Sequence, residues 1–411
     1  MPTKNTADQA SVRELNLSLV LRVIYNEAPI SRAQLAARTG LNKSTVSSLV
    51  EELMNYRLIH ETGINSVGTG RPATLLEINP LVGCIVGVEL GVDFVAVVLT
   101  DFIGKILWRQ MAAADPTDDQ ETTLARTLSL VSGAITACRE KGLNLLGLGV
   151  AAPGTVDVEE GILIFAPNLQ WRNVPLRAIF SQYTGLKVFV ENDANSAAVA
   201  EHLFGAVREC KNFIFVFAGV GIGGGLFLNG QLYRGHNGYA GEIGHSPIMA
   251  EPFQSSCHCG NRGCWETYAN QHSIFQRVRE RLEAKRSSII PKLLEEQNVS
   301  LSIAIIKQAA DKEDSEARAS FAEAGTAMGQ GITSLINIFN PEKVILGGPL
   351  SIAGDYLLPA IKDTVSQHSL PETVQHADVL LSMFGSDASL IGAIAIVVDD
   401  ILSNPTQVER R

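Results

Sequence analysis

The sequence lacks a long hydrophobic run, and it has less positive than negative charge. No apolar stretch approaches the about 20 residues that span a bilayer, and residues 1–13 are polar, without the apolar core of a secretion signal. Lys and Arg number 33 against 43 Asp and Glu, which gives a net charge of −10. We therefore expect a cytoplasmic protein that contacts no membrane. The overall charge also argues against nucleic-acid binding.

Charged residues are scarce as a class, at 18% of 411 residues, whereas apolar residues make up 46%. No excess of charge is present to keep the chain unfolded, and about 150 residues per domain predicts two or three domains. The charge is unevenly distributed, because residues 1–80 carry eight basic and seven acidic residues and the rest carries 25 and 36. A head of charge +1 thus precedes a body of charge −11, and the head has to be considered separately.

Cysteine is sparse, and half of the six residues are clustered. Three are scattered among apolar residues: Cys84, Cys138 and Cys210. Three lie within eight residues: Cys257, Cys259 and Cys264. With His245 they form a closed set of three thiolates and one imidazole, which is typical of structural Zn²⁺ and leaves no open position for catalysis. His258 could replace His245, but we expect its ring to point outward; the alternative is three reduced structural cysteines.

The first 80 residues contain a pattern of three helices. Residues 11–26 have apolar side chains at helical spacing: Leu15, Leu19, Val23 and Ile24. A capping box of Ser31 and Gln34 begins a second helix over about residues 31–39, which Gly40 ends. Asn42 caps a third helix with an apolar stripe: Val46, Leu49, Val50 and Leu53. Two short helices joined by a tight turn are typical of a helix-turn-helix.

The third helix and a following wing are the candidate DNA-binding surface. The candidate contacts are Lys43, Ser44, Thr45, Ser47, Ser48 and Arg71. Small polar side chains let a helix enter the major groove, and Arg71 lies between two predicted strands, residues 58–62 and 73–78, where it could enter a minor groove. The alternative is a helical triplet that binds nothing. We assign residues 1–62 to the DNA-binding domain and 63–82 to the wing and linker.

The body predicts an α/β fold with an internal duplication. Three strands, a helix and a further strand occupy residues 84–152, and a similar order recurs from residue 212 to residue 346. This pattern indicates two related lobes with a cleft between them. The first lobe comprises residues 83–193 with about 387–402, and the second comprises residues 194–386.

Glycine is locally abundant in the body, with 12 of the 36 between Gly219 and Gly263. The run from Gly219 to Gly225 is unsuited to an ordinary strand interior and indicates a close approach of the backbone to another group. Neither the Gly-x-x-x-x-Gly-Lys-Ser/Thr nor the Gly-x-Gly-x-x-Gly-helix pattern of nucleotide-binding loops is present.

A polar segment, residues 191–195, follows a predicted strand and precedes a helix. Open α/β sheets bind ligands at such strand ends. Asp193 is either a general base toward a hydroxyl or an N-cap of the helix. Together with Asn192, Glu242 and Glu266 it supplies planar hydrogen-bonding groups suited to neighbouring sugar hydroxyls.

These motifs together resemble the ROK family (repressor, open reading frame, kinase) over nearly the whole chain. The head, from Leu41 to Ser48 and on to Gly70-Arg71-Pro72, is particularly similar to that of the xylose repressors, and the body resembles the actin-like, hexokinase-type sugar kinase fold. The resemblance implies a structural zinc on His245, Cys257, Cys259 and Cys264. It also implies sugar contacts from Asn168, Asn192, Asp193, Glu242, His245 and Glu266, with Asp193 at the position of the kinases' catalytic base.

Three departures from the kinase pattern fall around the expected ATP site. Asp93 stands where the first phosphate loop has Thr, Val220 replaces a second Thr, and Pro349 replaces a Gly on the adenosine side. The chain is therefore expected to be a sugar-responsive repressor of carbohydrate-utilisation genes, acting as a homodimer or dimer of dimers on operator DNA. Xylose is the first candidate inducer, ahead of glucose and N-acetylglucosamine. The alternatives are an ATP-dependent sugar kinase with a DNA-binding head, and a repressor displaced by a phosphotransferase-system protein.

Overall fold

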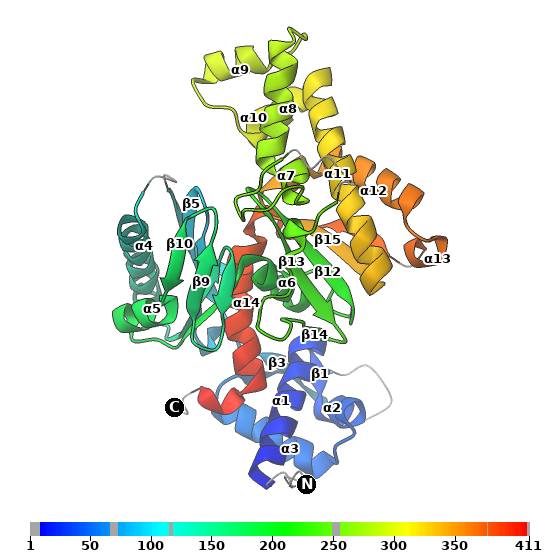
Figure 1. Cartoon of the computed structure of the whole chain (residues 1–411). Coiled ribbons are helices and arrows are strands. Elements are labelled where there is room, and N and C mark those ends of the chain that lie inside the picture. The colour runs from blue at the N-terminus through cyan, green and yellow to red at the C-terminus, as the bar shows by residue number, and fades with distance from the viewer. Residues whose placement is uncertain (1–8, 66–72, 115–117, 249–254, 376, 409–411) are drawn as a thin grey trace, which may run out of the picture.

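The computed structural model describes residues 9–65, 73–114, 118–248, 255–375 and 377–408. A small head lies at one end of the molecule, the two α/β lobes lie side by side next to it, and a helical group projects from the opposite end (Figure 1). Among the described residues, no helix is both long enough and apolar enough to cross a membrane. The mixed α/β architecture with an N-terminal winged helix-turn-helix is the one that the sequence predicts.

The head consists of three helices and a three-stranded sheet. Its helices are α1 (Gln9–Glu27), α2 (Arg32–Thr39) and α3 (Lys43–Asn55). Its strands β1 (Ile30–Ser31), β2 (Ile59–Asn65) and β3 (Ala73–Ile78) pair in the antiparallel order β1-β3-β2. The predicted wing is thus present as β2 and β3, but its tip with Arg71 lies outside the described residues. In α1, Leu15 is 67% exposed, whereas the neighbouring face with Leu17 and Leu21 is buried.

The predicted caps of α2 and α3 and the predicted apolar stripe of α3 are confirmed, whereas Leu15 and Leu19 of the predicted stripe of α1 are exposed. The Ser31 hydroxyl accepts the Gln34 N–H and the Gln34 side chain accepts the Ser31 N–H, so the capping box is complete. Gly40 follows α2 in the left-handed region at φ 71°, and the Asn42 side chain caps α3. All four residues of the predicted apolar stripe of α3 are buried. These contacts fix the turn between α2 and α3.

The two lobes have sheets of the same topology. The first contains β4 (Cys84–Leu90), β5 (Phe94–Asp101), β6 (Ile106–Ala113), β7 (Leu145–Ala152) and β11 (Val188–Asn192), in the order β11-β7-β4-β5-β6. The second contains β12 (Phe213–Ala218), β13 (Ile222–Leu228), β14 (Gln231–Leu232), β15 (Lys343–Gly347) and β16 (Asp378–Leu381), in the order β14-β13-β12-β15-β16. In each, three antiparallel strands are extended by two parallel strands, so the predicted duplication is confirmed.

Equivalent helices occupy equivalent places in the two lobes. The pairs are α4 (Gln120–Glu140) with α11 (Ser315–Phe339), α5 (Leu176–Thr184) with α12 (Gly354–His368), and α6 (Asp193–Leu203) with α14 (Ala388–Ser403). Helices α6 and α14 pack closely where the lobes meet, because a Cβ on Gly392 would lie 2.1 Å from the Ser196 carbonyl oxygen. The junction of the lobes is therefore a tight helix crossing.

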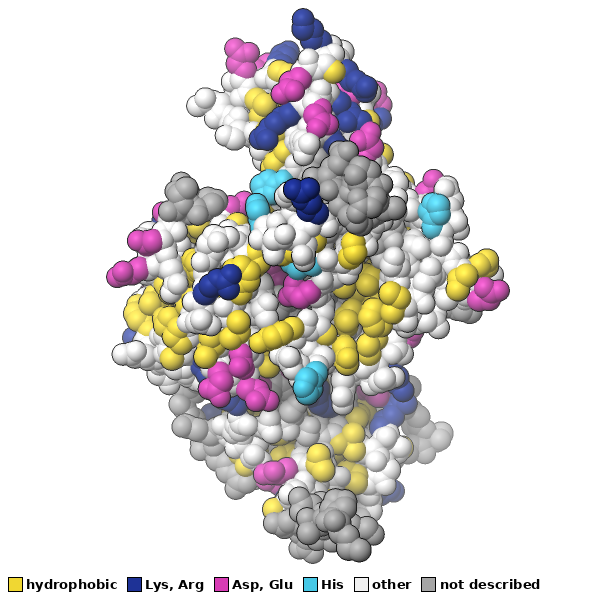
Figure 2. All heavy atoms as spheres, in the orientation of Figure 1, with side chains coloured by type: hydrophobic (Ala, Val, Ile, Leu, Met, Phe, Trp, Pro, Cys, Tyr) yellow, Lys and Arg dark blue, Asp and Glu magenta, His cyan; other side chains and the backbone are white. Residues whose placement is uncertain are grey.

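Two additions to the duplicated core are not apparent from the sequence pattern. A separate sheet of β8 (Thr155–Asp157), β9 (Ile162–Ala166) and β10 (Trp171–Val174) extends the first lobe. Helices α7 (Glu266–Ala269), α8 (Gln271–Glu283), α9 (Ile290–Gln297) and α10 (Ile303–Asp311) precede α11, and α13 (Pro371–Val374) follows α12. The projecting helices α8–α10 carry basic and acidic side chains next to one another on the face seen in Figure 2.

Part of the glycine-rich run is strand, contrary to the prediction. Gly223, Gly224 and Gly225 lie inside β13 and pair with β12. The predicted close approach is nevertheless present, because a Cβ on Gly225 would lie 2.5 Å from the Ala194 carbonyl oxygen of α6. The glycines let α6 lie directly on the strand, which outweighs their low strand propensity.

The head shares its hydrophobic core with the body. Buried side chains of α1 and α3 belong to the same cluster as those of α6 and α14. The Tyr25 and Phe102 rings meet edge to face at 6.3 Å between centroids. Arg22 of α1 donates to Asp399 of α14 at 2.8 Å and to the Ser403 hydroxyl at 2.6 Å. The head is therefore seated on the C-terminal end of α14.

Candidate functional site

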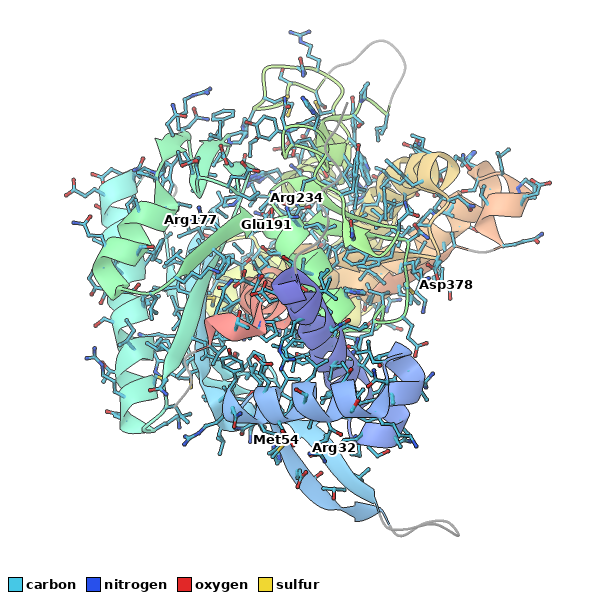
Figure 3. The ribbon with its side chains drawn as sticks, turned by 90° about the horizontal axis from the view of Figure 1, so that it is seen from below. Arg32, Met54, Arg177, Glu191, Arg234 and Asp378 are labelled. Carbon is cyan, nitrogen blue, oxygen red and sulfur yellow. The ribbon has the colours of Figure 1, made fainter. Side chains whose placement is uncertain are left out.

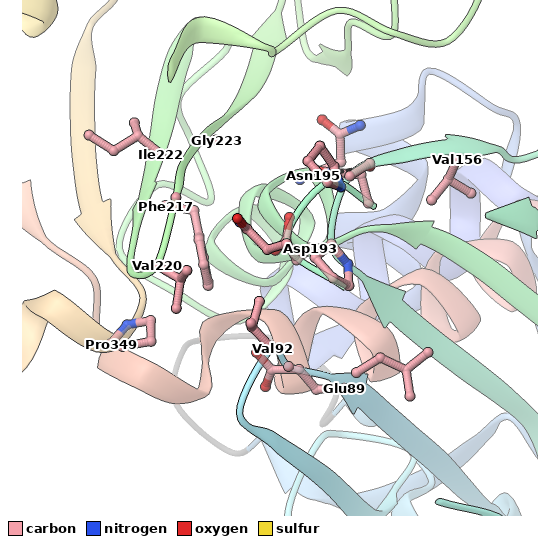
Figure 4. A pocket seen from close by; sticks show the side chains of 18 of the residues that line it. Glu89, Val92, Val156, Asp193, Asn195, Phe217, Val220, Ile222, Gly223 and Pro349 are labelled. Atoms are coloured by element: carbon pink, nitrogen blue, oxygen red, sulfur yellow. Dashed lines mark hydrogen bonds between the residues drawn. The ribbon is translucent and has the colours of Figure 1, made fainter. Parts of the chain in front are cut away.

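A cavity of about 380 Å³ lies in the cleft between the lobes (Figure 4). All six residues predicted to contact a sugar line it: Asn168, Asn192, Asp193, Glu242, His245 and Glu266. They come from both lobes and from loops that are far apart in sequence. A few polar side chains that converge in a mostly apolar cavity are typical of a small-molecule binding site.

The strand-to-helix junction of β11 and α6 positions Asn192 and Asp193. The Asn192 side chain caps α6 by accepting the Asn195 N–H at 3.0 Å, and its Nδ2 donates to the Gly154 carbonyl at 2.9 Å. One of the two predicted roles of Asp193 was that of N-cap of this helix. That role is wrong, because Asn192 is the N-cap residue. Asp193 is the first residue of the helix, and its Oδ1 accepts the Ala194 N–H at 2.8 Å.

Asp193 lies in an environment that favours its protonated form. Burial raises its pKa to about 7, the hydrogen bond from Ala194 opposes this rise, and the nearby Glu242 adds to it. A carboxyl group with such a pKa exchanges protons near neutral pH, as a general base or a hydroxyl-orienting group does.

Glu242, His245 and Glu266 form a cluster on the opposite lobe. His245 Nε2 lies 3.7 Å from Glu242 Oε2, and His245 Nδ1 lies 3.5 Å from Glu266 Oε1. Burial raises the pKa of Glu242, and His245 opposes that rise. The imidazole therefore stands between two carboxyl groups, with its Nε2 edge toward Glu242.

The other edge of His245 faces the cysteine cluster. The donor atoms of His245, Cys257, Cys259 and Cys264 all lie within 4.8 Å of one another. His245 Nδ1 is 3.6 Å from Cys257 Sγ, and Cys259 Sγ is 3.8 Å from Cys264 Sγ. Tetrahedral zinc with its usual bond lengths separates nitrogen from sulfur by about 3.6 Å and two sulfurs by about 3.8 Å. The four residues thus match the donor set and spacing of a tetrahedral metal site.

His258 is exposed, as predicted, and the imidazole grouped with the three cysteines is that of His245. The His258 Nδ1 lies 3.0 Å from Asn168 Oδ1, and because the amide oxygen only accepts, Nδ1–H is the donor. Asn168 lies between β9 and β10 of the first lobe, whereas His258 belongs to the cysteine loop of the second. The exposed ring therefore forms a contact between the lobes that the sequence did not predict.

Sequence reasoning missed several residues of the site. Glu89, 4% exposed, reaches the cavity from β4, and burial together with Asp193 and Asp387 raises its pKa well above the usual value. Arg109 donates to both carboxylate oxygens of Asp387, at 2.5 and 2.8 Å. These two residues are 278 positions apart, so no local pattern could have joined them.

An ion pair between the buried Glu191 and the partly exposed Arg234 supports the Asn192 junction. Glu191, 2% exposed, accepts hydrogen bonds from the Asn195 amide and from Arg234 of the second lobe, the latter at 2.8 Å (Figure 3). The Asn192 N–H also donates to Glu191. The segment 191–195 was predicted as a ligand-binding junction, but the role of Glu191 as its support becomes visible only in three dimensions.

The three departures from the kinase pattern lie in one place. Asp93, Val220 and Pro349 all line the same cavity as the six predicted sugar contacts. Figure 4 shows Val220 and Pro349 next to each other in its wall, and we call this part of the cavity its far end.

The candidate DNA contacts lie on the outer side of the head. Lys43, Ser44 and Ser48 are exposed, whereas Thr45 and Ser47 are half-buried. The Ser44 hydroxyl donates to Asn42, and the Ser47 hydroxyl donates to the Lys43 carbonyl. Arg13 of α1, which the sequence did not single out, reaches α3 and donates to Ser48 and Glu52. At the other end of α3, Met54 lies beside Arg32 (Figure 3).

Known proteins resemble the chain over both parts. Residues 85–400 match the ROK family, and residues 16–59 match winged helix-turn-helix DNA-binding domains. The xylose repressor of Bacillus subtilis is 34% identical and that of Caldicellulosiruptor bescii 33%, each over 396 residues, which is 96% of this chain and 98% of the relative. The transcriptional dual regulator NagC of Escherichia coli is 33% identical over 94% of this chain and 93% of its own.

Solved structures agree with these relatives. A ROK family transcriptional regulator, a homologue of the Escherichia coli MLC protein, superposes with a TM-score of 0.82 at 30% identity, covering 97% of this chain and 99% of its own. A ROK family glucokinase from Streptomyces griseus, in complex with glucose and AMPPNP, has a TM-score of 0.67 at 32% identity, covering 76% of this chain and 99% of its own. The chain belongs to the ROK family and carries a winged helix-turn-helix head.

Proposed function

We propose that the protein is a transcriptional repressor whose DNA binding responds to a sugar bound between the lobes. The observation that carries the proposal is the presence, in one chain, of a winged helix-turn-helix and a ROK cleft whose polar groups converge at one end. Relatives named as xylose and N-acetylglucosamine repressors support it.

The head would bind operator DNA through α3. Its exposed Lys43, Ser44 and Ser48 would face the major groove, with Thr45 and Ser47 beside them, and Arg71 would reach the minor groove from the wing. A homodimer, or a dimer of dimers, would place two heads on two half-sites. The near-neutral charge of the head implies modest non-specific affinity, because phosphate neutralisation dominates that contribution.

The polar end of the cleft would bind the sugar. Asn168, Asn192, Asp193, Glu242, His245 and Glu266 offer paired donors and acceptors for neighbouring hydroxyls. Xylose is our first candidate, from the similarity of the head and the names of the relatives, followed by glucose and N-acetylglucosamine. Sugar would act by binding one arrangement of the lobes better than the other.

We assign Zn²⁺ to the cysteine cluster as a structural metal. The donor set is closed and the spacing is tetrahedral, so the metal would supply order to the loop and no catalytic position. Bound metal would hold His245 with its Nε2 edge toward the sugar. A metal bound to one nitrogen of the imidazole ring fixes the orientation of the ring, and with it the direction of the other nitrogen.

A direct test starts from the full-length protein. A thermal-shift screen against sugars should identify the ligand, because binding to the folded state raises apparent stability. That sugar should then change the mobility shift of an operator fragment. An operator shift that is equal with and without every sugar would contradict the induction step. A pull-down that retains a phosphotransferase-system protein, combined with no sugar affinity by calorimetry, would favour control by a protein partner.

A sugar kinase is the second candidate, because Asp193 lies in the cavity at the position of the kinases' base. A coupled ADP-release assay with hexoses and xylose decides between the two. Turnover that disappears in Asp193→Asn would favour the kinase, whereas the replacement of two phosphate-loop hydroxyls by Asp93 and Val220 leads us to expect none.

A further inference from the structure

A group of apolar side chains lines the far end of the cleft. They come from both lobes: Val92, Phe94, Met111, Phe217, Val220 and Pro349. Figure 4 shows Val92 near Asp193, with Phe217, Val220 and Pro349 across the opening. Because Asp193 borders this group, a ligand that contacts Asp193 would point one substituent toward it.

These side chains are not simply part of the core. Val92, Phe217, Val220 and Pro349 are each partly exposed, although they line an interior cleft. Among the described residues, Val92, Met111 and Val220 pack against none of the buried hydrophobic clusters. Their apolar surface remains available, and burying it against a ligand would be favourable.

The charges around this end disfavour an anion. Glu89, Asp93 and Asp387 supply carboxyl groups. Arg109 is the one arginine or lysine among the described residues that line the cavity, and both of its terminal nitrogens are engaged by Asp387. A phosphate would therefore meet carboxylates without a free cation. Burial and the nearby Asp193 and Asp387 raise the pKa of Glu89, and an uncharged group meets no such opposition from these carboxyl groups.

The size of the cavity also exceeds the need of one sugar ring. A volume of about 380 Å³ lies within the range of pockets that enclose drug-sized ligands. One sugar ring held by the six predicted sugar contacts would therefore leave room for a substituent.

We propose that the far end of the cleft, between Val92 on one lobe and Val220 on the other, binds an uncharged apolar group carried by the sugar at the hydroxyl that meets Asp193. The ligand class is an alkyl or aryl ether or ester of the sugar, or a glycoside whose aglycone enters this end. The proposal rests on sugar binding at the polar end, and its test separates the two.

The test uses calorimetry on the full-length protein with a matched series of ligands. The series contains the free sugar identified by thermal shift and its O-methyl, O-propyl, O-phenyl and phosphate derivatives at each hydroxyl in turn. At one position, affinity should increase from methyl to propyl by about fourfold for each added methylene, as expected for a buried CH₂ group. Phosphate at that same position should weaken binding by at least about tenfold, roughly the cost of one unfavourable charge contact in a partly buried site.

Three outcomes are informative. If no sugar binds, sugar recognition itself fails. If the free sugar binds but every substituent weakens it at every position, the apolar subsite fails and sugar recognition stands. If phosphate tightens binding at the position next to Asp193, the far end is an anion site and the proposal is overturned.

Two near-isosteric variants locate the effect. Val92→Thr and Val220→Thr should each lower the ratio of O-propyl to free-sugar affinity by about threefold or more, because each replaces a methyl group with a hydroxyl that must be desolvated. Val299→Thr, exposed in the loop after α9 and remote from the cavity, is the matched control and should leave the ratio unchanged. An equal ratio in all four proteins would place the substituent elsewhere.

Discussion

The two ends of the cleft differ in how their side chains are held. At the polar end, Asn168 is hydrogen-bonded to His258, Asn192 caps a helix, and His245 lies between two carboxyl groups and three thiols. At the far end, Val92 and Val220 offer apolar side chains, and the polar pair of Arg109 and Asp387 is engaged with itself. The difference indicates that the polar end is the part of the cavity whose side chains are oriented in advance for a ligand.

The largest effect should come from removing a member of the cysteine cluster. Cys264→Ser should lower bound zinc and weaken sugar binding by at least about tenfold, because His245 and Glu266 lose their support. Metal analysis and calorimetry measure the two effects. Cys210→Ser, a cysteine outside the cluster, is the control. Full sugar affinity in a zinc-free Cys264→Ser protein would show that the polar end does not depend on the cluster.

A slightly smaller effect is expected from Asp193→Asn. The amide cannot accept the charge-assisted hydrogen bond of a carboxylate, so sugar affinity should fall by about tenfold to a hundredfold. Calorimetry measures the loss. Asp363→Asn, an exposed position on α12, serves as a control for the substitution type. If Asp193→Asn retains full affinity, Asp193 does not contact the ligand, and the polar end does not bind the sugar in the way we propose.

The same residue should make binding depend on pH. The pKa of Asp193 is raised to about 7, so below that pH the group is protonated and above it becomes a stronger acceptor for a sugar hydroxyl. Affinity should therefore rise as pH increases through about 7. Glu89 and Glu242 face Asp193, and both have raised pKa values from burial. Comparison with Asp193→Asn isolates its share, and an identical pH profile in that variant would assign the dependence to the other groups.

The hydrogen bond between His258 and Asn168 should have the smallest effect. His258→Ala should weaken sugar binding by about twofold to tenfold, the range of a single neutral hydrogen bond, while zinc content stays constant. His258→Gln, which retains a donor, should recover part of the loss. A loss of zinc in His258→Ala would instead indicate a role within the cysteine loop.

Local patterns allowed much of the molecule to be predicted. The capping box at Ser31, the cap at Asn42 and the stripe of α3 depend on residues within one or two helical turns, so spacing alone specifies them. The cysteine cluster was predictable for the same reason, except that its fourth member, His245, lies twelve residues from Cys257.

Features that depend on distant contacts could not be predicted. Arg109 and Asp387 meet only because the first sheet and α14 pack together, and the burial of Glu89 follows from the same packing. The contact between His258 and Asn168 was not predicted, because nothing in the neighbours of His258 reveals that Asn168 approaches from the other lobe. The glycines of β13 were predicted to be unsuited to a strand. Their neighbours in the sequence do not reveal that the distant helix α6 packs directly against them.

Helix α14 begins at the cleft and ends beneath the head. At its first turn the Ser389 hydroxyl donates to the Asp193 carbonyl at 3.0 Å, and toward its other end Asp399 accepts from Arg22. Sixteen residues make it about 24 Å long. If the helix moves as a unit, the energy of any coupling must be the same in both directions. Operator DNA would then alter sugar affinity by the same factor by which sugar alters operator affinity. The sugar concentration to which the protein responds would therefore depend on the fraction of the protein that is bound to DNA.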